Sequence, residues 1–544
     1  MKKYTGKGIY GAVAMGKIAI FHKEKTDVQP GLAAETSVEK ARLAEALTEA
    51  GKQLREVYDR ALREVGEADA RIFEVHRMLL EDVDYVGLIE NTIESQRVNA
   101  EYAVTAAADR YAEMFAAMED ADMRARAADV RDISDRLIAN LRGEGIRRQE
   151  SVEKVILCAA DLSPSETISL DRENILALVT AHGSVNSHSA ILARGMQIPA
   201  VVGVGEDFLA EVAEGSRAIV DGYEGEILVD PDSEICNTYA DRQRAAGERK
   251  RLLQQLRGKE NITVDGREVR VLANIGDIRD IVAALQNDAG GIGLFRSESL
   301  YLESRDYPAE ERQFAVYKQA LESMGGRKVI IRTLDIGADK QADYFGLKKE
   351  ENPALGCRAI RICLARPELF KTQLRALYRA SVYGDLGILF PMITGVAELE
   401  KVLDICREVR EELDARNVPY SPDVELGIMI ETPAAALISD RLAPMVDFFS
   451  VGTNDLIQYT LACDRQNPDV QAFVDPCHEA ILRLIRMSAD NAHRHGTRIG
   501  ICGELAADTN LTETFLRMGI DELSVSPAFV LEVRDKVRSL DLSQ

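Results

Sequence analysis

The sequence predicts a multidomain α/β protein whose second half is a (β/α)8 barrel of the TIM type. From residue 260 to the end, eight short apolar runs alternate with amphipathic helical patterns, as they do in such a barrel. Residues 37–141 carry apolar side chains at spacings of three and four, with little Gly or Pro, which predicts a bundle of antiparallel helices. Residues 150–230 then alternate strands with helices, so we expect an α/β domain there.

Length and composition restrict the class of protein. A chain of 544 residues is too long for a single core and suggests three or four domains. The net charge of −23 disfavours binding to nucleic acid or to anionic membranes. Lys7 and Lys17 interrupt the N-terminal segment, and no apolar run is long enough to span a bilayer. We therefore expect no signal peptide, no membrane insertion and a cytoplasmic location. The eight scattered cysteines, with no Cys-x-x-Cys pair, fit reduced thiols there.

The first half divides by pattern. Residues 6–21 predict one short strand, and the helical stretch has an apolar stripe at Leu43, Leu47, Leu54 and Leu62. His76 is a lone histidine on this stretch, and we expect a surface or packing residue without chemistry. The following strands are expected at Val152–Ala159, Ile175–Thr180, Ala200–Val204 and Ala218–Val229. Residues 235–257, rich in Arg and Gln, predict an exposed helix that joins the two halves.

Residues 182–203 contain the first candidate site. The run before them predicts a strand, Gly183 and Ser184 predict a turn, and a helix is expected to begin near Ser187. His188 would then lie in the first helical turn, where free N–H groups and the helix dipole favour an anion. A neutral imidazole there could attack phosphorus and hold the phosphoryl product. A capping segment with an incidental histidine remains the plain alternative.

The second half contains polar residues directly after its apolar runs. The runs are Val269–Ile275, Gly290–Phe295, Lys328–Leu334, Leu386–Met392, Glu425–Ile430, Asp447–Val451, Arg498–Cys502 and Glu522–Val525. Arg296, Arg332, Glu431, Asp455 and Cys502 lie at five of their ends. A single such residue could be a helix cap, but in a barrel these strand ends meet at one face, where active sites lie. An open doubly wound sheet is the alternative fold, yet its glycine-rich nucleotide fingerprint is missing.

The residue types at these ends indicate a chemistry. Glu431 and Asp455 are hard oxygen ligands of the kind that Mg²⁺ binds. Asn454 can donate to a phosphate oxygen, and Cys502 is a candidate proton donor, because a thiol with a pKa near ~8.5 is protonated at neutral pH. Planar guanidinium forks that suit a carboxylate and a phosphate are offered by Arg296, Arg332, Arg358 and Arg465.

Residues 182–203 resemble the phosphohistidine motif shared by Enzyme I of the bacterial sugar phosphotransferase system, phosphoenolpyruvate synthase and pyruvate phosphate dikinase. Ser184 and Asn186 replace the usual Gly and Thr. The matching residues are Ser187, His188, Ile191, Ala193, Arg194, Pro199 and Gly203. The last two families need an additional ATP-binding domain, and no stretch of the chain is left over for one.

The barrel half resembles the phosphoenolpyruvate-binding barrel of Enzyme I over most of its length. Ser297 stands where Thr is usual, Cys357 where an aromatic residue is usual, and Cys477 lies in another variant motif. The matching pieces begin at Gly291, Arg332, Glu351, Phe390, Ile430, Ser450, Asp464 and Ile501.

The resemblance implies an activity and a set of roles. Phosphoenolpyruvate would bind to the barrel with Mg²⁺ on Glu431 and Asp455, and the phosphoryl group would pass to His188, with Cys502 as the proton donor to the leaving enolate. A histidine of the phosphocarrier protein HPr would then accept the phosphoryl group. The resemblance also implies supporting residues near the histidine: Thr167, Arg126 and Arg131. Salt bridges from the two arginines to Asp129 or Asp132 are the plain alternative, and Thr167 could instead cap the following helix.

The resemblance also implies the domain organisation and the assembly. A phosphohistidine domain would comprise residues 1–30 and 145–232, with an HPr-binding helical bundle, residues 31–144, inserted into it. A linker helix, 233–259, would lead to the phosphoenolpyruvate-binding barrel, 260–544, through which a homodimer would form. The phosphohistidine domain would swing between its two partners, unless its tether is too short. The alternative of another class is a regulatory paralogue that binds phosphoenolpyruvate or a carrier without turnover.

Overall fold

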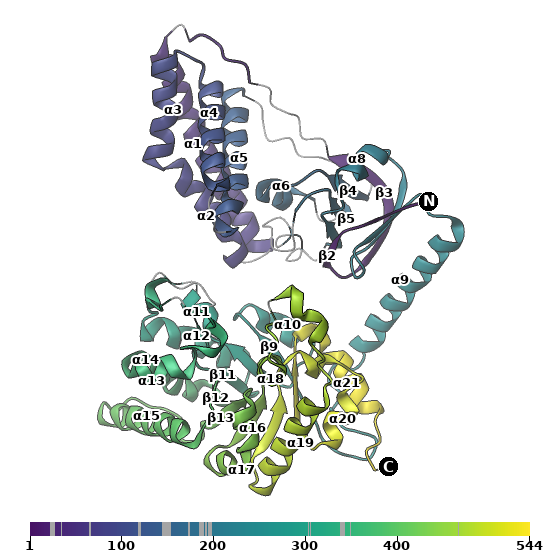
Figure 1. Ribbon diagram of the computed structural model, residues 1–544, viewed down its shortest axis with the longest axis vertical. Coiled ribbons are helices and arrows are strands. Elements are labelled where there is room, and N and C mark those ends of the chain that lie inside the picture. Colours follow the sequence, from purple (N-terminus) through teal and green to yellow (C-terminus); the bar gives the residue numbers. More distant parts are fainter. Residues whose placement is uncertain are drawn as a thin grey trace. The chain divides into compact units, whose positions relative to one another are not determined.

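Two compact units, Met1–Gly247 and Glu248–Gln544, make up the chain in its computed structural model (Figure 1). The structure describes residues 1–21, 28–33, 35–64, 67–117, 121–143, 154–171, 174–183, 190, 193, 198–302, 304, 306–337, 343–348, 350–465 and 467–543. The boundary between the units falls within α9 (Ser233–Gln254), a largely exposed helix in which, among its described residues, only Leu253 is buried. None of the described helices is both long and apolar enough to cross a membrane.

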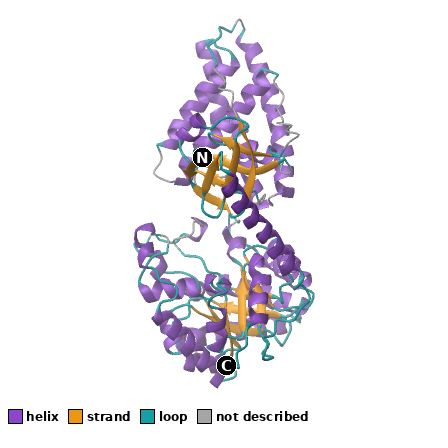
Figure 2. Ribbon diagram, turned by 90° about the vertical axis from the view of Figure 1, so that its right-hand side faces the viewer, coloured by secondary structure: helices purple, strands orange, loops and turns teal. Residues whose placement is uncertain are grey.

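A mixed sheet is the centre of the first unit (Figure 2). Its order across the described residues is β1-β8-β7-β3-β4-β5-β6-β2. Strands β3 to β6 run parallel, and the other pairings are antiparallel. The bounds are β1 (Lys2–Thr5), β2 (Lys7–Tyr10), β3 (Val13–Phe21), β4 (Val155–Ala159), β5 (Ile175–Thr180), β6 (Ala200–Val202), β7 (Arg217–Asp221) and β8 (Glu226–Val229).

One strand prediction for this sheet is incomplete and another is wrong. The short strand expected in residues 6–21, at Lys17–Phe21, is the last part of β3, but β2 and β1, which precede it, were missed. The short edge strands pair with β8 and β6, which are remote in sequence, so no local pattern reveals them. The predicted single strand Ala218–Val229 is a hairpin of β7 and β8. Its turn is fixed where the Asp221 carboxylate accepts from the amide of Tyr223 (3.0 Å) and where Gly225 has a φ of 68°.

The predicted helical bundle is present in the first unit. Leu43 and Leu54 are 1% exposed in its core, whereas Leu62 is 41% exposed, so the apolar stripe ends before that residue. The bundle core continues into one face of the sheet through Leu157 and Leu178. The described helices are α1 (Thr36–Glu64), α2 (Glu67–Leu80), α3 (Val83–Gln96), α4 (Ala100–Ala116) and α5 (Ala121–Leu141).

Two short helices complete the described part of the first unit. α6 (Pro164–Ser169) begins with a capping box, in which Ser163 and Glu166 each accept from the other's backbone amide. α8 (Glu206–Glu211) packs Phe208 onto the second face of the sheet, against residues such as Ile156 and Val179. Both faces of the sheet are thus covered by apolar side chains.

The second unit is a closed barrel of parallel strands, which confirms the predicted fold class. Each predicted run contains one strand. Their bounds are β9 (Arg270–Ile275), β10 (Ile292–Arg296), β11 (Val329–Arg332), β12 (Leu386–Phe390), β13 (Glu425–Ile430), β14 (Phe448–Val451), β15 (Arg498–Ile501) and β16 (Glu522–Val525).

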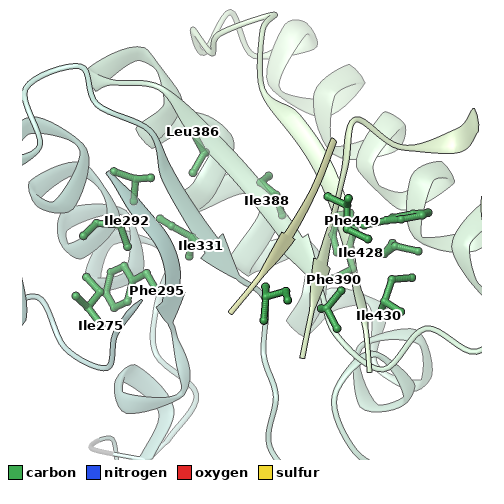
Figure 3. Close-up of a cluster of buried hydrophobic side chains, with 14 of the residues drawn as sticks. Ile275, Ile292, Phe295, Ile331, Leu386, Ile388, Phe390, Ile428, Ile430 and Phe449 are labelled. Carbon is green, nitrogen blue, oxygen red and sulfur yellow. The ribbon is translucent and has the colours of Figure 1, made fainter. Parts of the chain in front are cut away.

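Helices surround these strands. The described ones are α10 (Asp280–Gln286), α11 (Glu298–Leu302), α12 (Glu310–Ser323), α13 (Ile360–Ala365), α14 (Pro367–Ala380), α15 (Val396–Ala415), α16 (Pro433–Leu437), α17 (Ser439–Leu442), α18 (Thr453–Leu461), α19 (Glu479–Arg494), α20 (Thr512–Arg517) and α21 (Val530–Ser539). The side chains between strands and helices form one large core, in which Ile331, Ile388, Ile428 and Phe449 contribute from successive strands (Figure 3).

Alternate strand residues point into the barrel, because side chains on a strand face opposite sides in turn. Leu294, Ile330, Leu389, Met429 and Phe448 form a separate apolar cluster with Cys502, and we call these five residues the barrel plug. The ring of Phe448 fits because residue 427 is a glycine: a Cβ at that position would lie only 2.4 Å from the ring. The plug is thus a second, smaller core inside the ring of strands.

The amino ends of the strands carry a group of charges. Lys328 pairs with Asp385 (2.8 Å) and Glu425 (2.7 Å), and Arg498 also bonds Glu425. Glu522 lies next to Gly500, whose Cβ would be 2.9 Å from that of Glu522. Charged groups therefore occupy the end of the barrel opposite to the strand ends at which a site is expected.

Candidate active site

Strand alternation brings three predicted site residues into the mouth of the barrel. Arg332 follows Ile330 by two positions, and Glu431 follows Met429 by two, so both share the inward direction of the barrel plug. Cys502, directly after β15, belongs to the plug cluster itself. All three side chains are buried, with exposures of 8%, 1% and 3% for Arg332, Glu431 and Cys502.

Buried carboxylates hold the arginines at this mouth. Arg332 donates to Glu298 (3.0 Å) and pairs with Asp335 (2.8 Å). Asp335 also binds Arg358, at 2.9 Å. Desolvation disfavours the charged guanidinium groups, but these carboxylates outweigh it and raise the pKa of both arginines. The two arginines are thus fixed, charged and only 8% and 3% exposed, as binding groups for an anion should be.

Asp455 lies beside the same group, in the first turn of α18. Its carboxylate is 3.6 Å from Arg358 and 3.0 Å from Arg465. The Arg465 side chain is 44% exposed, so it lies at the rim. Asn454 exchanges two hydrogen bonds of 3.1 Å with Glu504, which use one of the two N–H donors of its side-chain amide.

Glu431 and Asp455 form a pair of acidic groups. Burial and the nearby Asp455 and Asp335 carboxylates raise the pKa of Glu431 well above its usual value. One Glu431 oxygen accepts from the amide of Met392 (2.6 Å), and among the described residues no hydrogen bond engages the other. Gly452 has no side chain and so leaves room for Glu431: a Cβ at position 452 would lie only 3.0 Å from the Cβ of Glu431.

These two carboxylates fit a divalent cation. The described residues contain no group of three or more His, Cys, Asp or Glu side chains that could hold a metal alone. A pair of hard oxygen donors, with water and substrate oxygens in the remaining positions, is nevertheless the usual donor set for Mg²⁺. A cation would also relieve the repulsion that raises the pKa of Glu431.

Cys502 remains a thiol near neutral pH. Burial raises its pKa to about 11, with smaller opposite contributions from a hydrogen bond with Ser450 and from Arg332 and Arg296. The Cys502 carbonyl accepts from Asn274 (2.8 Å), which also donates to Ser524 (3.0 Å). The thiol is therefore held in place at the end of its strand and keeps its proton.

Arg296 completes the predicted arginines. It ends β10 and is exposed, so its guanidinium is available at the mouth. Three residues of this site were absent from the sequence prediction: Glu298, Asp335 and Tyr459, whose hydroxyl accepts from Arg358 (3.2 Å). Asp335 lies three positions after Arg332, and that spacing was the available signal. Glu298 and Tyr459 reach the site only through the tertiary fold.

The predicted nucleophile, His188, lies outside the described residues. The strand before it, β5, is present, and Gly183 has a φ of 103°, as the predicted turn requires. Ala190 and Ala193, in the predicted helix, are helical and buried. Thr167 is 1% exposed and donates to the carbonyl of Ser163 (2.9 Å).

The two predicted supporting arginines are exposed on α5. Among the described residues, neither Arg126 nor Arg131 has an ion-pair partner, and Asp129 and Asp132 flank His76 instead. The imidazole of His76 is fully buried, 3.3 Å from Asp129 and 3.6 Å from Asp132. His76 is therefore a packing residue between α2 and α5, and both arginines present their side chains to solvent.

Comparison with known families identifies the chain. The family model described as PEP-utilising enzyme, PEP-binding domain, matches residues 250–542. Those described as PEP-utilising enzyme, N-terminal, and PEP-utilising enzyme, mobile domain, match residues 5–126 and 152–225. The chain therefore belongs to the PEP-utilising enzymes, a family that acts on phosphoenolpyruvate.

Curated relatives narrow this class. The phosphoenolpyruvate-protein phosphotransferase of Priestia megaterium is 41% identical over 540 residues, which covers 99% of this chain and 94% of the relative. That of Geobacillus stearothermophilus is 42% identical over 541 residues, covering 98% and 93%. An NMR solution structure of Enzyme I (nEIt) is 32% identical, covers 45% of this chain and 99% of its own, and has a TM-score of 0.38. The chain is an enzyme of the phosphoenolpyruvate-protein phosphotransferase type, and phosphoenolpyruvate-dependent phosphotransfer is its activity.

Proposed function

We propose that the enzyme transfers the phosphoryl group of phosphoenolpyruvate to its own His188 and then to a histidine of HPr, releasing pyruvate. This is the first step of the sugar phosphotransferase system. The observation that carries the proposal is the buried group of Arg332, Arg358, Glu431 and Asp455 beside a protonated Cys502 at one mouth of the barrel. It offers cationic, metal-binding and proton-donating groups together.

Phosphoenolpyruvate binds at this mouth through its two anionic groups. Arg332 and Arg358 are fixed by carboxylates and offer donors to its phosphate and carboxylate. Arg296 and Arg465, which are more exposed, close over the ligand from the rim, and Asn454 donates to a phosphate oxygen. Positioning and charge neutralisation do most of the work in phosphoryl transfer.

The carboxylates of Glu431 and Asp455 would hold Mg²⁺. The bound ion would supply positive charge to the phosphate oxygens. Glu431 must be ionised for this role, which the cation favours by offsetting the burial of its carboxylate.

The reaction forms one bond and breaks another. A neutral His188 nitrogen attacks phosphorus, the bond from phosphorus to the enol oxygen breaks, and the enolate leaves with that electron pair. Cys502 gives its thiol proton to the methylene carbon of the enolate, which makes pyruvate, and solvent later restores the proton. Burial suits this donor, because it keeps the thiol protonated until the enolate forms.

The phosphohistidine is then stabilised and passed on. Arg126 and Arg131, exposed on α5, donate to the phosphoryl oxygens of the phosphohistidine, and Thr167 orients its imidazole. The bundle, residues 31–144, docks HPr, and the phosphohistidine domain, residues 1–30 and 145–232, carries the group to it. A homodimer forms through the barrel, residues 260–544, after the linker helix 233–259. Eight free thiols support a reducing, cytoplasmic setting.

Transfer of label tests this proposal. The purified protein is incubated with radiolabelled phosphoenolpyruvate, with and without Mg²⁺, beside a His188→Ala variant. We expect an acid-labile, base-stable, Mg²⁺-dependent label that is absent from the variant and that moves to added HPr. Intact phosphoenolpyruvate binding without label would reject catalysis and favour a regulatory paralogue.

A further inference from the structure

A chain of buried polar side chains lies behind the ends of β10 and β11, outside the ring of groups that face the substrate. Each member is at most 1% exposed, although each carries a hydroxyl or an amide. Burial of such groups is costly unless every donor and acceptor is paired. The members are Ser297, Tyr301, Gln313, Tyr317 and Gln373.

Gln373 on α14 is the centre of this chain. Its Oε1 accepts from the backbone amide of Leu334 (3.0 Å). Its Nε2 donates to Ser297 Oγ and to Tyr317 Oη, each at 3.1 Å. The orientation of the side-chain amide is fixed, because a backbone N–H can only donate and must face the oxygen.

The other protons then have a single arrangement. Ser297 donates to the carbonyl of Arg332 (2.7 Å), so its oxygen is free to accept from Gln373. Tyr317 donates to Gln313 Oε1 (3.2 Å), and Gln313 Nε2 donates to the carbonyl of Pro308 (2.9 Å). The network therefore has one direction, from α14 to the backbone of Arg332 on one side and to α12 on the other.

This network holds a bend in the chain after β11. Thr333 still bonds the neighbouring strand, with its amide 3.0 Å from the carbonyl of Leu389, but Leu334 turns its amide to Gln373. The bend lets Asp335 return to Arg332, three residues earlier, at 2.8 Å. Asp335 holds Arg358 as well, so the position of both arginines depends on the bend.

We propose that Gln373 is a positioning residue for phosphoenolpyruvate: by bonding Leu334 and Ser297 it fixes the Arg332–Asp335 turn and thereby both substrate-binding arginines. The inference rests on the proposed function, since it assigns those arginines to the substrate. Gln373 touches neither substrate nor metal, and its effect passes through the backbone on either side of Thr333.

Substitutions at the centre of the network and at its Arg332 end separate positioning from packing. Gln373→Met keeps the volume but loses every bond, and Ser297→Ala loses the hydroxyl that holds the Arg332 carbonyl. We expect each to raise the KM and the Kd for phosphoenolpyruvate by about 10- to 100-fold, as loss of supporting hydrogen bonds around a site usually does. Ser297→Thr, which keeps a hydroxyl, should retain wild-type values. Tyr317→Phe is the matched control, because it removes two buried hydrogen bonds, to Gln373 and to Gln313, but leaves the bonds of Gln373 to Leu334 and Ser297 in place.

A further variant gives a readout that packing alone would not produce. In Gln373→Glu, an ionised carboxylate only accepts, so the Ser297 proton turns away from Arg332, whereas a protonated carboxyl can donate its single proton to Ser297 in place of the amide. Burial raises the pKa of such a carboxyl toward neutrality. The titratable and charged groups around it are Tyr317 on α12, Glu298 on α11, Arg332 at the end of β11 and Asp335 after it, and all are also present in the wild type. The KM of this variant, relative to wild type, should therefore fall as the pH is lowered.

Calorimetric binding of phosphoenolpyruvate and label transfer are measured in parallel on the full-length proteins. Wild-type affinity in both Ser297→Ala and Gln373→Glu at every pH would overturn the inference. So would an equal loss of affinity in Tyr317→Phe, because the effect would then be general destabilisation. Wild-type protein that binds phosphoenolpyruvate but takes no label would contradict the proposed function alone.

Discussion

Glu522, at the amino end of β16, makes the stability of the barrel depend on pH. Burial raises its pKa from 4.5 to about 7, despite attraction by Arg270, Arg498 and Lys328. Between about pH 4.5 and pH 7 the folded barrel holds a proton that the unfolded chain has released. The free energy of unfolding therefore falls as the pH rises through this range. The shift corresponds to roughly 3 kcal/mol as an upper figure. Because Glu522 is partly exposed, solvent screening reduces this, and we expect about 1–3 kcal/mol.

Replacing Glu522 with Gln keeps the neutral form at every pH. The Glu522→Gln variant should match wild type near pH ~4.5 and gain about 1–3 kcal/mol above pH ~7. Urea unfolding, followed by a probe of the barrel at several pH values, measures the difference. Glu268→Gln, an exposed glutamate at the same end, is the control and should show no such gain. A gain that is equal at acidic and alkaline pH would refute the reasoning, because it would not come from ionisation.

Further outcomes follow from the catalytic mouth. Cys502 is buried and has a pKa of about 11, so iodoacetamide should alkylate it far more slowly than the exposed Cys357 and Cys477. Peptide mass spectrometry measures these rates, and equal rates would contradict the burial of Cys502. Asp335→Ala leaves the buried guanidinium groups of Arg332 and Arg358 without their shared carboxylate. It should lower the free energy of unfolding, measured in urea, by about 3–5 kcal/mol. A decrease below ~1 kcal/mol would mean that the arginines find other partners. Gly452→Ala places a Cβ against the Glu431 carboxylate, to which the proposed function assigns Mg²⁺. The substitution should raise the Mg²⁺ concentration for half-maximal activity by about 10-fold, and an unchanged requirement would place the metal elsewhere.

The barrel and much of its mouth could be predicted from the sequence because local signals coincide there. Each strand lies in a short apolar run, and several site residues end such a run or follow it closely, as Glu431 follows Ile430. Strand alternation then decides that Arg332 and Cys502 point inward. None of these steps requires knowledge of which segments meet in space.

The features that were missed all depend on non-local contacts. The edge strand β1 pairs with β8, more than two hundred residues away. Glu298 carries no periodic signal, and its role appears only when β10 and β11 lie side by side. Gln373 would pass for an ordinary residue of α14 until the fold brings the amide of Leu334 against it. Buried polar side chains interrupt a hydrophobic pattern without indicating which partner satisfies them.

The barrel plug divides the barrel into two chambers. Its apolar side chains separate the acidic and basic groups around Glu522 from Arg332 and Glu431 at the opposite mouth. A charge altered near Glu522 is therefore separated from the opposite mouth by apolar protein atoms and not by water.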